Sequence, residues 1–80
     1  MASSVKDVLE YIAKNIVDDP DAVQVAESLD GDDVTLRLSV APDDVGKVIG
    51  RRGRTARAIR DMVRAAGART GITASVEIEG

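Results

Sequence analysis

Two glycines that flank two arginines, Gly50-Arg51-Arg52-Gly53, constrain this chain more than any other stretch of it. A short apolar run, residues 45–49, precedes them, and a basic, alanine-rich segment follows. Because glycine has no Cβ, Gly50 and Gly53 allow the backbone to turn sharply and to approach a ligand closely. The stretch therefore predicts a tight turn between two helices.

The helix that begins after this turn offers a site for an anion. The start of a helix presents unpaired backbone N–H groups and the positive end of the helix dipole, and phosphate binds readily there. Arg51 and Arg52 at the tip of the turn, with Lys47 and Arg54 beside them, add positive charge. We therefore expect this turn to hold a phosphate group.

The charges of the chain are segregated along the sequence. A net charge of −3 argues, by itself, against a polyanionic partner. However, only three of the 11 basic residues precede Asp44, and the rest lie between Lys47 and Arg69, where Asp61 is the only acid. Because local potential steers a polyanion more than net charge does, we expect one basic face.

The composition excludes several classes of chemistry. The 80 residues, enough for one domain over 1–80, contain no cysteine and no histidine, so disulfides, thiol nucleophiles, zinc fingers and histidine bases are excluded. The carboxylates form no obvious acid–base pair, and we expect no enzymatic activity, metal or cofactor. No apolar run approaches the roughly 20 residues that span a bilayer, and residues 1–6 do not resemble a signal peptide. We expect a cytoplasmic protein with no membrane insertion.

The first half of the chain reads as a helix and a hairpin. Apolar residues recur at spacings of three and four from Val5 to Val17, which predicts a helix that opens with a capping box of Ser4 and Asp7 and stops before Pro20. Alternating residues predict strands at 22–29 and 34–40, joined by turn residues into an antiparallel pair. The second strand is expected at the centre of the sheet.

The second half reads as two helices and a strand. Asp43 or Asp44 is expected to cap a short helix over 44–49, and a longer helix over 54–66 is expected to end at Gly67 or Gly71. The apolar residues expected to face the core from these two helices are Val45, Val48, Ile49, Ala56, Ile59, Met62, Val63 and Ala66. Residues 72–78 alternate as a last strand, and a crossover through two helices favours parallel pairing. We predict an α+β fold in which helices cover one face of a three-stranded mixed sheet.

The central block resembles a known family. The segment 48–53 matches the VIGxxG signature of KH domains, and the order α-β-β-α-α-β resembles the type II KH fold. Residues 18–20, 40–44, 46–50 and 53–56 are similar to the small bacterial single-KH proteins of the KhpA family. The resemblance covers nearly the whole chain.

This resemblance implies RNA binding. The Gly-x-x-Gly loop at 50–53 would clamp the backbone of single-stranded RNA, with the bases in an adjacent aliphatic groove. The residues implied to bind RNA are Lys47, Val48, Ile49, Gly50, Arg51, Arg52, Gly53, Arg54, Thr55, Arg57, Ile59 and Arg60. Leu36 and Leu38 lie on the same sheet, but the sequence leaves open which face reaches the groove. The family also implies an RNA chaperone that forms a homodimer or pairs with a KhpB (Jag)-type KH protein, and that affects cell-wall biogenesis and cell shape.

The residues leave a second function open. Tyr11 is the only aromatic residue, so bases cannot stack on aromatic platforms, and we expect micromolar RNA affinity. In the alternative, aliphatic surface near Ile49, Ile59 and Met62 docks a partner subunit in a protein-interaction or dimerisation module, and RNA binding is incidental. For Arg64 and Arg69 a solvated helix face is favoured over RNA contact.

Overall fold

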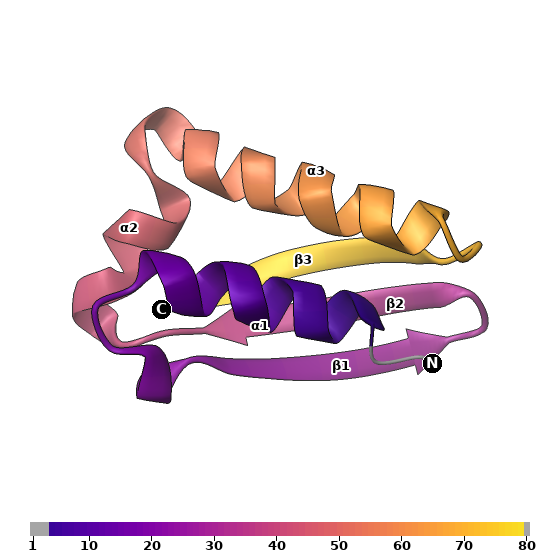
Figure 1. Cartoon of the computed structure of the whole chain (residues 1–80), viewed down its shortest axis with the longest axis horizontal. Helices are drawn as coiled ribbons and strands as arrows, with labels where there is room; N and C mark the ends of the chain where they lie inside the picture. The colour runs from indigo at the N-terminus through magenta and orange to yellow at the C-terminus, as the bar shows by residue number, and fades with distance from the viewer. Residues whose placement is uncertain (1–3, 80) are drawn as a thin grey trace.

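The computed structural model describes residues 4–79, without the side chain of Ser4, and its elements follow the predicted order (Figure 1). The helices and strands are α1 (Ser4–Ile16), β1 (Gln24–Asp30), β2 (Asp33–Ser39), α2 (Val45–Ile49), α3 (Arg54–Ala68) and β3 (Thr73–Glu79). Short 3₁₀ helices lie at Pro20–Ala22, Pro42–Asp44 and Arg51–Gly53. The predicted capping box depends on the Ser4 side chain and therefore lies outside the described residues.

The three strands form one mixed sheet in the order β1-β2-β3, with β2 in the centre as predicted. A two-residue turn joins β1 to β2, which pair antiparallel with Asp30 opposite Asp33. The chain then crosses through α2 and α3 and returns parallel to β2, with Leu36 opposite Val76. A connection through helices allows this parallel pairing, whereas a tight turn does not.

Helices α1 and α3 lie side by side over one face of the sheet (Figure 1). Val34, Leu36 and Leu38 alternate along β2 and are buried beneath them. Leu9 from α1 and Ile59 from α3 meet them with no exposed surface. Each such buried aliphatic side chain contributes about 1.5–3 kcal/mol to folding, so this layer forms the core of the type II KH fold.

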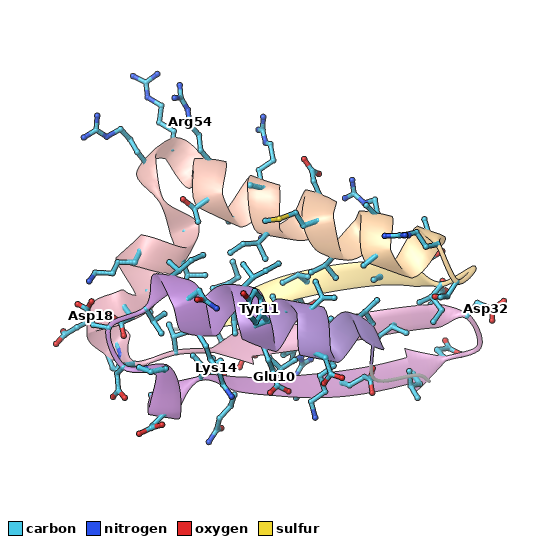
Figure 2. The ribbon with its side chains drawn as sticks, in the orientation of Figure 1. Glu10, Tyr11, Lys14, Asp18, Asp32 and Arg54 are labelled. Atoms are coloured by element: carbon cyan, nitrogen blue, oxygen red, sulfur yellow. The ribbon has the colours of Figure 1, made fainter. Side chains whose placement is uncertain are left out.

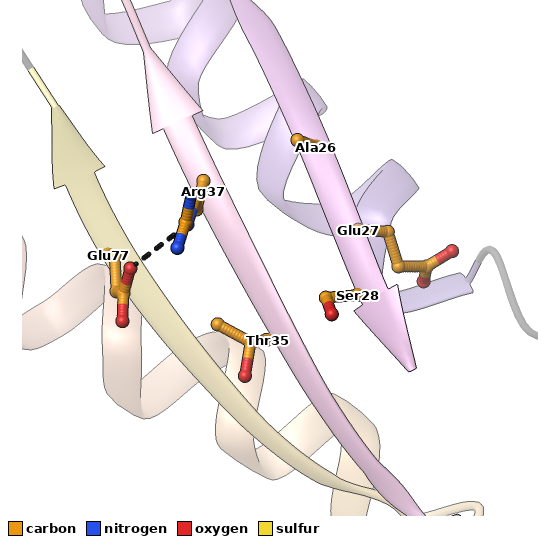
Figure 3. Close-up of a pocket in the computed structure, with 6 residues that line it drawn as sticks. All are labelled: Ala26, Glu27, Ser28, Thr35, Arg37 and Glu77. Atoms are coloured by element: carbon orange, nitrogen blue, oxygen red, sulfur yellow. Dashed lines mark ion pairs between the residues drawn. The ribbon is translucent and has the colours of Figure 1, made fainter. Parts of the chain in front are cut away.

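The other face of the sheet carries mostly small and polar side chains. Ala26, Ser28 and Thr35 line a shallow cavity of about 420 Å³ there (Figure 3). An ion pair between Arg37 Nε and Glu77 Oε1, 3.3 Å apart, spans β2 and β3 beside it. Both side chains of this pair are more than half exposed, so the pair contributes little to stability.

Two predicted core residues lie at the surface. Met62 is 47% exposed and Ile49 is 39% exposed. On α3 the buried residues Ala56, Ile59 and Val63 follow spacings of three and four and form one face of the helix. Met62 precedes Val63 by one position and is therefore rotated by about 100° away from that residue. Ile49 is the last residue of a helix of five residues and is rotated by a similar angle from the buried Val48.

The end of α3 also differs from the prediction. The helix continues through Gly67 to Ala68, and Gly71, with a φ of 76°, follows it. A Cβ on Gly67 would lie 2.8 Å from the carbonyl oxygen of Ile72 and 3.3 Å from Ala74 Cβ. This glycine therefore serves the close packing of α3 on β3 and does not end the helix.

Candidate nucleic-acid interface

The turn between α2 and α3 depends on glycine at position 50. The N–H of Gly50 donates to the carbonyl oxygen of Gly46 at 2.8 Å and closes α2. Gly50 then adopts φ 75° and ψ 174°, a region that is essentially restricted to glycine. A Cβ on Gly50 would lie 2.7 Å from Thr55 Cβ and 2.9 Å from the Thr55 backbone nitrogen. Both conformation and space therefore require a residue without a side chain here.

The next residues bend the backbone a second time before α3 begins. Arg52 has φ 57° and ψ 25°, and Gly53 has φ 74° and ψ 15°, so two consecutive residues are left-handed. Arg52 is the only described residue other than glycine with a positive φ. The conformation costs a residue with a side chain about 1–2 kcal/mol. Strain of this kind is common at ligand-binding loops.

The start of α3 is open to an anion. The N–H of Arg54 donates to the carbonyl oxygen of Arg51, but the N-cap residue, Gly53, provides no side-chain hydrogen bond to the helix, and the first turn carries no acidic residue. α3 has 15 residues, long enough for its backbone dipoles to add at this end. The N–H groups and the dipole together favour a negatively charged group beside the loop.

Four arginines surround this position. Arg51, Arg52, Arg54 and Arg57 are all exposed, and none takes part in the salt bridges found within residues 4–79. Figure 2 shows Arg54 at the loop end of α3, with its guanidinium directed into solvent and well away from Asp32 at the far hairpin. The loop is thus a concentration of unneutralised positive charge on a protein whose net charge is negative.

The arginines farther along α3 have protein partners. The Arg60 Nε donates to the carbonyl oxygen of Val76 at 3.3 Å, which ties α3 to β3. Arg64 lies 3.5 Å from the carboxylate of Asp61, in agreement with a solvated helix face. Of the predicted RNA-binding residues, Arg60 is therefore partly committed to the fold.

Lys47 on α2 is also paired. Its Nζ contacts the carboxylate of Asp18, which lies between α1 and β1. This hydrogen bond, together with the charges of Asp18 and Asp44, raises the pKa of Lys47 against a smaller opposing effect of desolvation. Lys47 therefore carries its charge next to two carboxylates, unlike the arginines of the loop.

Asp44 has a role that the sequence did not predict. Asp44 occupies the N-cap position of α2, as expected, but its side chain makes no capping hydrogen bond there. Asp44 is 2% exposed and accepts hydrogen bonds from the backbone N–H groups of Asp18, at 3.3 Å, and Asp19, at 3.1 Å. The carboxylate lies against the chain that follows α1 because that chain offers two unpaired donors, a contact across 25 residues that no local pattern reveals.

The structure separates the aliphatic residues that the resemblance implied at the RNA groove into buried and exposed ones. Val48 and Ile59 have no exposed surface and lie in the core, so neither reaches a ligand directly. Leu36 and Leu38, whose face the sequence left open, are buried in the same core. Ile49 remains the aliphatic side chain that is exposed next to the loop. The fully buried residues hold α2 and α3 in place beneath it.

Two features are absent from the described part of the chain. No group of three or more acidic side chains in residues 4–79 is arranged to hold a metal ion. None of the helices in the same range has the length and apolarity to cross a membrane.

Comparison with known proteins identifies relatives across most of the chain. The family model described as KhpA/KhpB, KH domain, matches residues 6–78. The RNA-binding protein KhpA of Clostridium acetobutylicum is 49% identical over 73 residues, which cover 91% of this chain and 97% of that protein. KhpA of Halalkalibacterium halodurans is 54% identical over 61 residues (76% and 80%), and KhpA of Streptomyces coelicolor is 53% identical over 64 residues (80% and 81%). No solved structure matches the chain significantly.

Proposed function

This chain belongs to the KhpA/KhpB family of KH domains, and from that premise we propose that it binds single-stranded RNA at the loop between α2 and α3. The relatives named above are RNA-binding proteins. The loop of this chain has the features that a phosphate backbone requires, namely a close backbone approach at Gly50, an open helix start and exposed arginines.

The observation that carries the proposal is the loop charge without protein partners. Arg51, Arg52, Arg54 and Arg57 make no ion pair within the described residues, whereas Lys47 and Arg64 do. Arginine donates to phosphate through a planar, bidentate group. A strand of RNA that follows the start of α3 would supply the phosphates that these side chains lack.

Base recognition contributes little in this proposal. Tyr11, the only aromatic residue, lies on α1 and is 73% exposed, away from the loop (Figure 2). Stacking on an aromatic side chain is worth about 1–3 kcal/mol per base, and the loop offers none. Ile49 provides an apolar contact instead. We therefore propose micromolar binding with weak base preference, which suits an RNA chaperone that must also release its RNA.

The test is fluorescence anisotropy with a short single-stranded RNA. The variant Arg51→Asp/Arg52→Asp keeps both glycines and should lose at least about tenfold in affinity through charge reversal at the site. The matched control, Arg64→Asp/Arg69→Asp, makes the same change in net charge at the far end of α3 and should bind nearly as wild type does. Circular dichroism checks the fold of both.

Salt gives an independent readout. The logarithm of the binding constant should fall with the logarithm of salt at a slope of about −0.7 for each phosphate contacted. Unchanged binding by the loop variant would move the RNA site elsewhere. Equal losses in the loop variant and its control would show attraction by net charge alone.

A second function is favoured by exposed apolar side chains on the helices. Of the residues expected at a docking surface, Ile49 and Met62 are 39% and 47% exposed, whereas Ile59 is fully buried and cannot contribute. Tyr11 on α1 is also exposed, at 73%. We propose as the alternative that this surface docks a second KH chain, either another copy or one of the KhpB type. Sedimentation should then show a dimer that persists in about 1 M salt, where RNA binding has been lost.

A further inference from the structure

Lys47 differs from the loop arginines in one respect: the protein itself supplies its counter-charge. Lys47 lies on α2, three residues before the loop, and its Nζ contacts the Asp18 carboxylate. Figure 2 shows Asp18 beside α2, at the same end of the molecule as Arg54. A phosphate that reaches Lys47 therefore meets a carboxylate already in place.

The fold holds Asp18 in this position. The buried carboxylate of Asp44 accepts the backbone N–H groups of Asp18 and Asp19, one on each oxygen. Because the anchor is the backbone, the side chain of Asp18 remains free to pair with Lys47. The position of the carboxylate is thus set by the connection after α1 and not by the flexible lysine.

The ion pair is nevertheless open to exchange. The Lys47 side chain is 44% exposed and the Asp18 side chain is 79% exposed. Exposed pairs of this kind are weak and are screened by salt. An incoming phosphate can therefore replace the carboxylate without disturbing the core.

We propose that Asp18 competes with RNA phosphate for Lys47 and so lowers the affinity of the RNA site. This inference rests on the proposed function and adds to it an intramolecular competitor that lowers the affinity for RNA. Lys47 contributes to binding only when a phosphate displaces Asp18, so the protein gains less from this lysine than from an unpaired one. The effect shortens the lifetime of the complex.

The first test compares Asp18→Asn with Asp19→Asn by RNA anisotropy in about 50 mM salt. Both substitutions remove one negative charge from adjacent exposed positions and keep the backbone N–H groups that Asp44 binds. Asp19 makes no side-chain ion pair within residues 4–79. Asp18→Asn should lower the dissociation constant about two- to fivefold, and Asp19→Asn should have a clearly smaller effect. Equal effects would overturn the inference.

The second test is a cycle with Lys47→Gln. This substitution should weaken RNA binding little in the wild-type background, where Lys47 is already paired, and several-fold in the Asp18→Asn background. If Lys47→Gln instead weakens binding more in the wild-type background than in the Asp18→Asn background, then Asp18 positions Lys47 for RNA. That result would also overturn the inference.

The two proposals fail in different ways. If wild type binds RNA and Arg51→Asp/Arg52→Asp does not, the proposed function stands whatever the Asp18 variants do. If wild type does not bind single-stranded RNA, both the proposed function and the proposed competition by Asp18 are wrong.

Discussion

Substituting alanine for the glycines around the loop should change stability in opposite directions. In Gly50→Ala the new Cβ meets Thr55 at 2.7–2.9 Å, and the backbone lies in a region that only glycine occupies freely. The backbone strain costs about 1–3 kcal/mol, and displacement of the start of α3 adds about 1–3 kcal/mol more. We expect the melting temperature to fall by at least about 10 °C, since 1 kcal/mol shifts a domain of this size by about 4–8 °C.

Two other glycines separate the steric contribution from the conformational one. Gly53 is also left-handed, but a Cβ there meets nothing within 4 Å, so Gly53→Ala should cost only the strain of about 1–2 kcal/mol. Gly46 lies within α2 with open space around it and no positive φ. Gly46→Ala should therefore stabilise the protein by about 0.5–1 kcal/mol.

Urea or thermal unfolding followed by circular dichroism measures this series. The expected order of stability is Gly46→Ala, wild type, Gly53→Ala and Gly50→Ala, from highest to lowest. If Gly50→Ala is no less stable than Gly53→Ala, the close approach of Gly50 to Thr55 is absent, and the geometry derived for the loop is wrong.

Further predictions concern the groups that support the site. Asp44→Ala should lower the free energy of unfolding, measured in urea, by about 2–3 kcal/mol because two backbone donors lose their partner. Asp43→Ala, at an exposed position, should change it by no more than about 0.5 kcal/mol. Gly67→Ala should cost about 1–3 kcal/mol by pushing α3 away from β3; a neutral result would show that the two elements separate freely. The pKa of Lys47 is raised above its ordinary value of 10.5, so the stability that its pair with Asp18 contributes is fully present below that pH and is lost as pH rises through the folded-state value. Asp18→Asn should remove this alkaline dependence, as measured by unfolding between neutral pH and pH of about 11.5.

The order of elements and the sheet topology could be predicted because local signals decide them. α1 ends at Ile16, before Pro20 as predicted, and the alternation along β2 places Val34 and Leu36 on the covered face. The two-helix crossover gives the parallel pairing of β2 with β3. The bounds of the elements follow from residues that are close together in the sequence, and the parallel pairing follows from the order of the elements.

The features around the loop that the sequence did not reveal have a common physical origin. Whether Val48 or Ile49 faces the core depends on how a helix of only five residues is rotated, and its packing against the rest of the protein sets that rotation. The contacts of Asp44 with residues 18–19 and of Arg60 with Val76 join segments that are distant in sequence. Charge and glycine patterns identify the loop, but they do not show which charges the protein neutralises itself.

This last distinction separates the basic residues near the loop into two groups. Arginines 51, 52, 54 and 57 have no acidic partner within the described residues, whereas Lys47 has one. Under the proposed function, a domain with no aromatic platform at its loop would depend on such charges for its affinity for RNA. The pairing of Lys47 with Asp18 would then lower that affinity.

The most direct test of the account is an NMR titration of the labelled protein with a short single-stranded RNA, followed through the backbone amides. We predict the largest shifts at residues 50–56, where the loop and the start of α3 lie, with Lys47 and Ile49 next. The amides of β1 and of the hairpin at Gly31 should remain unchanged. Shifts that centre on the open face of the sheet, or on the exposed face of α1 around Tyr11, would contradict a phosphate clamp at the loop.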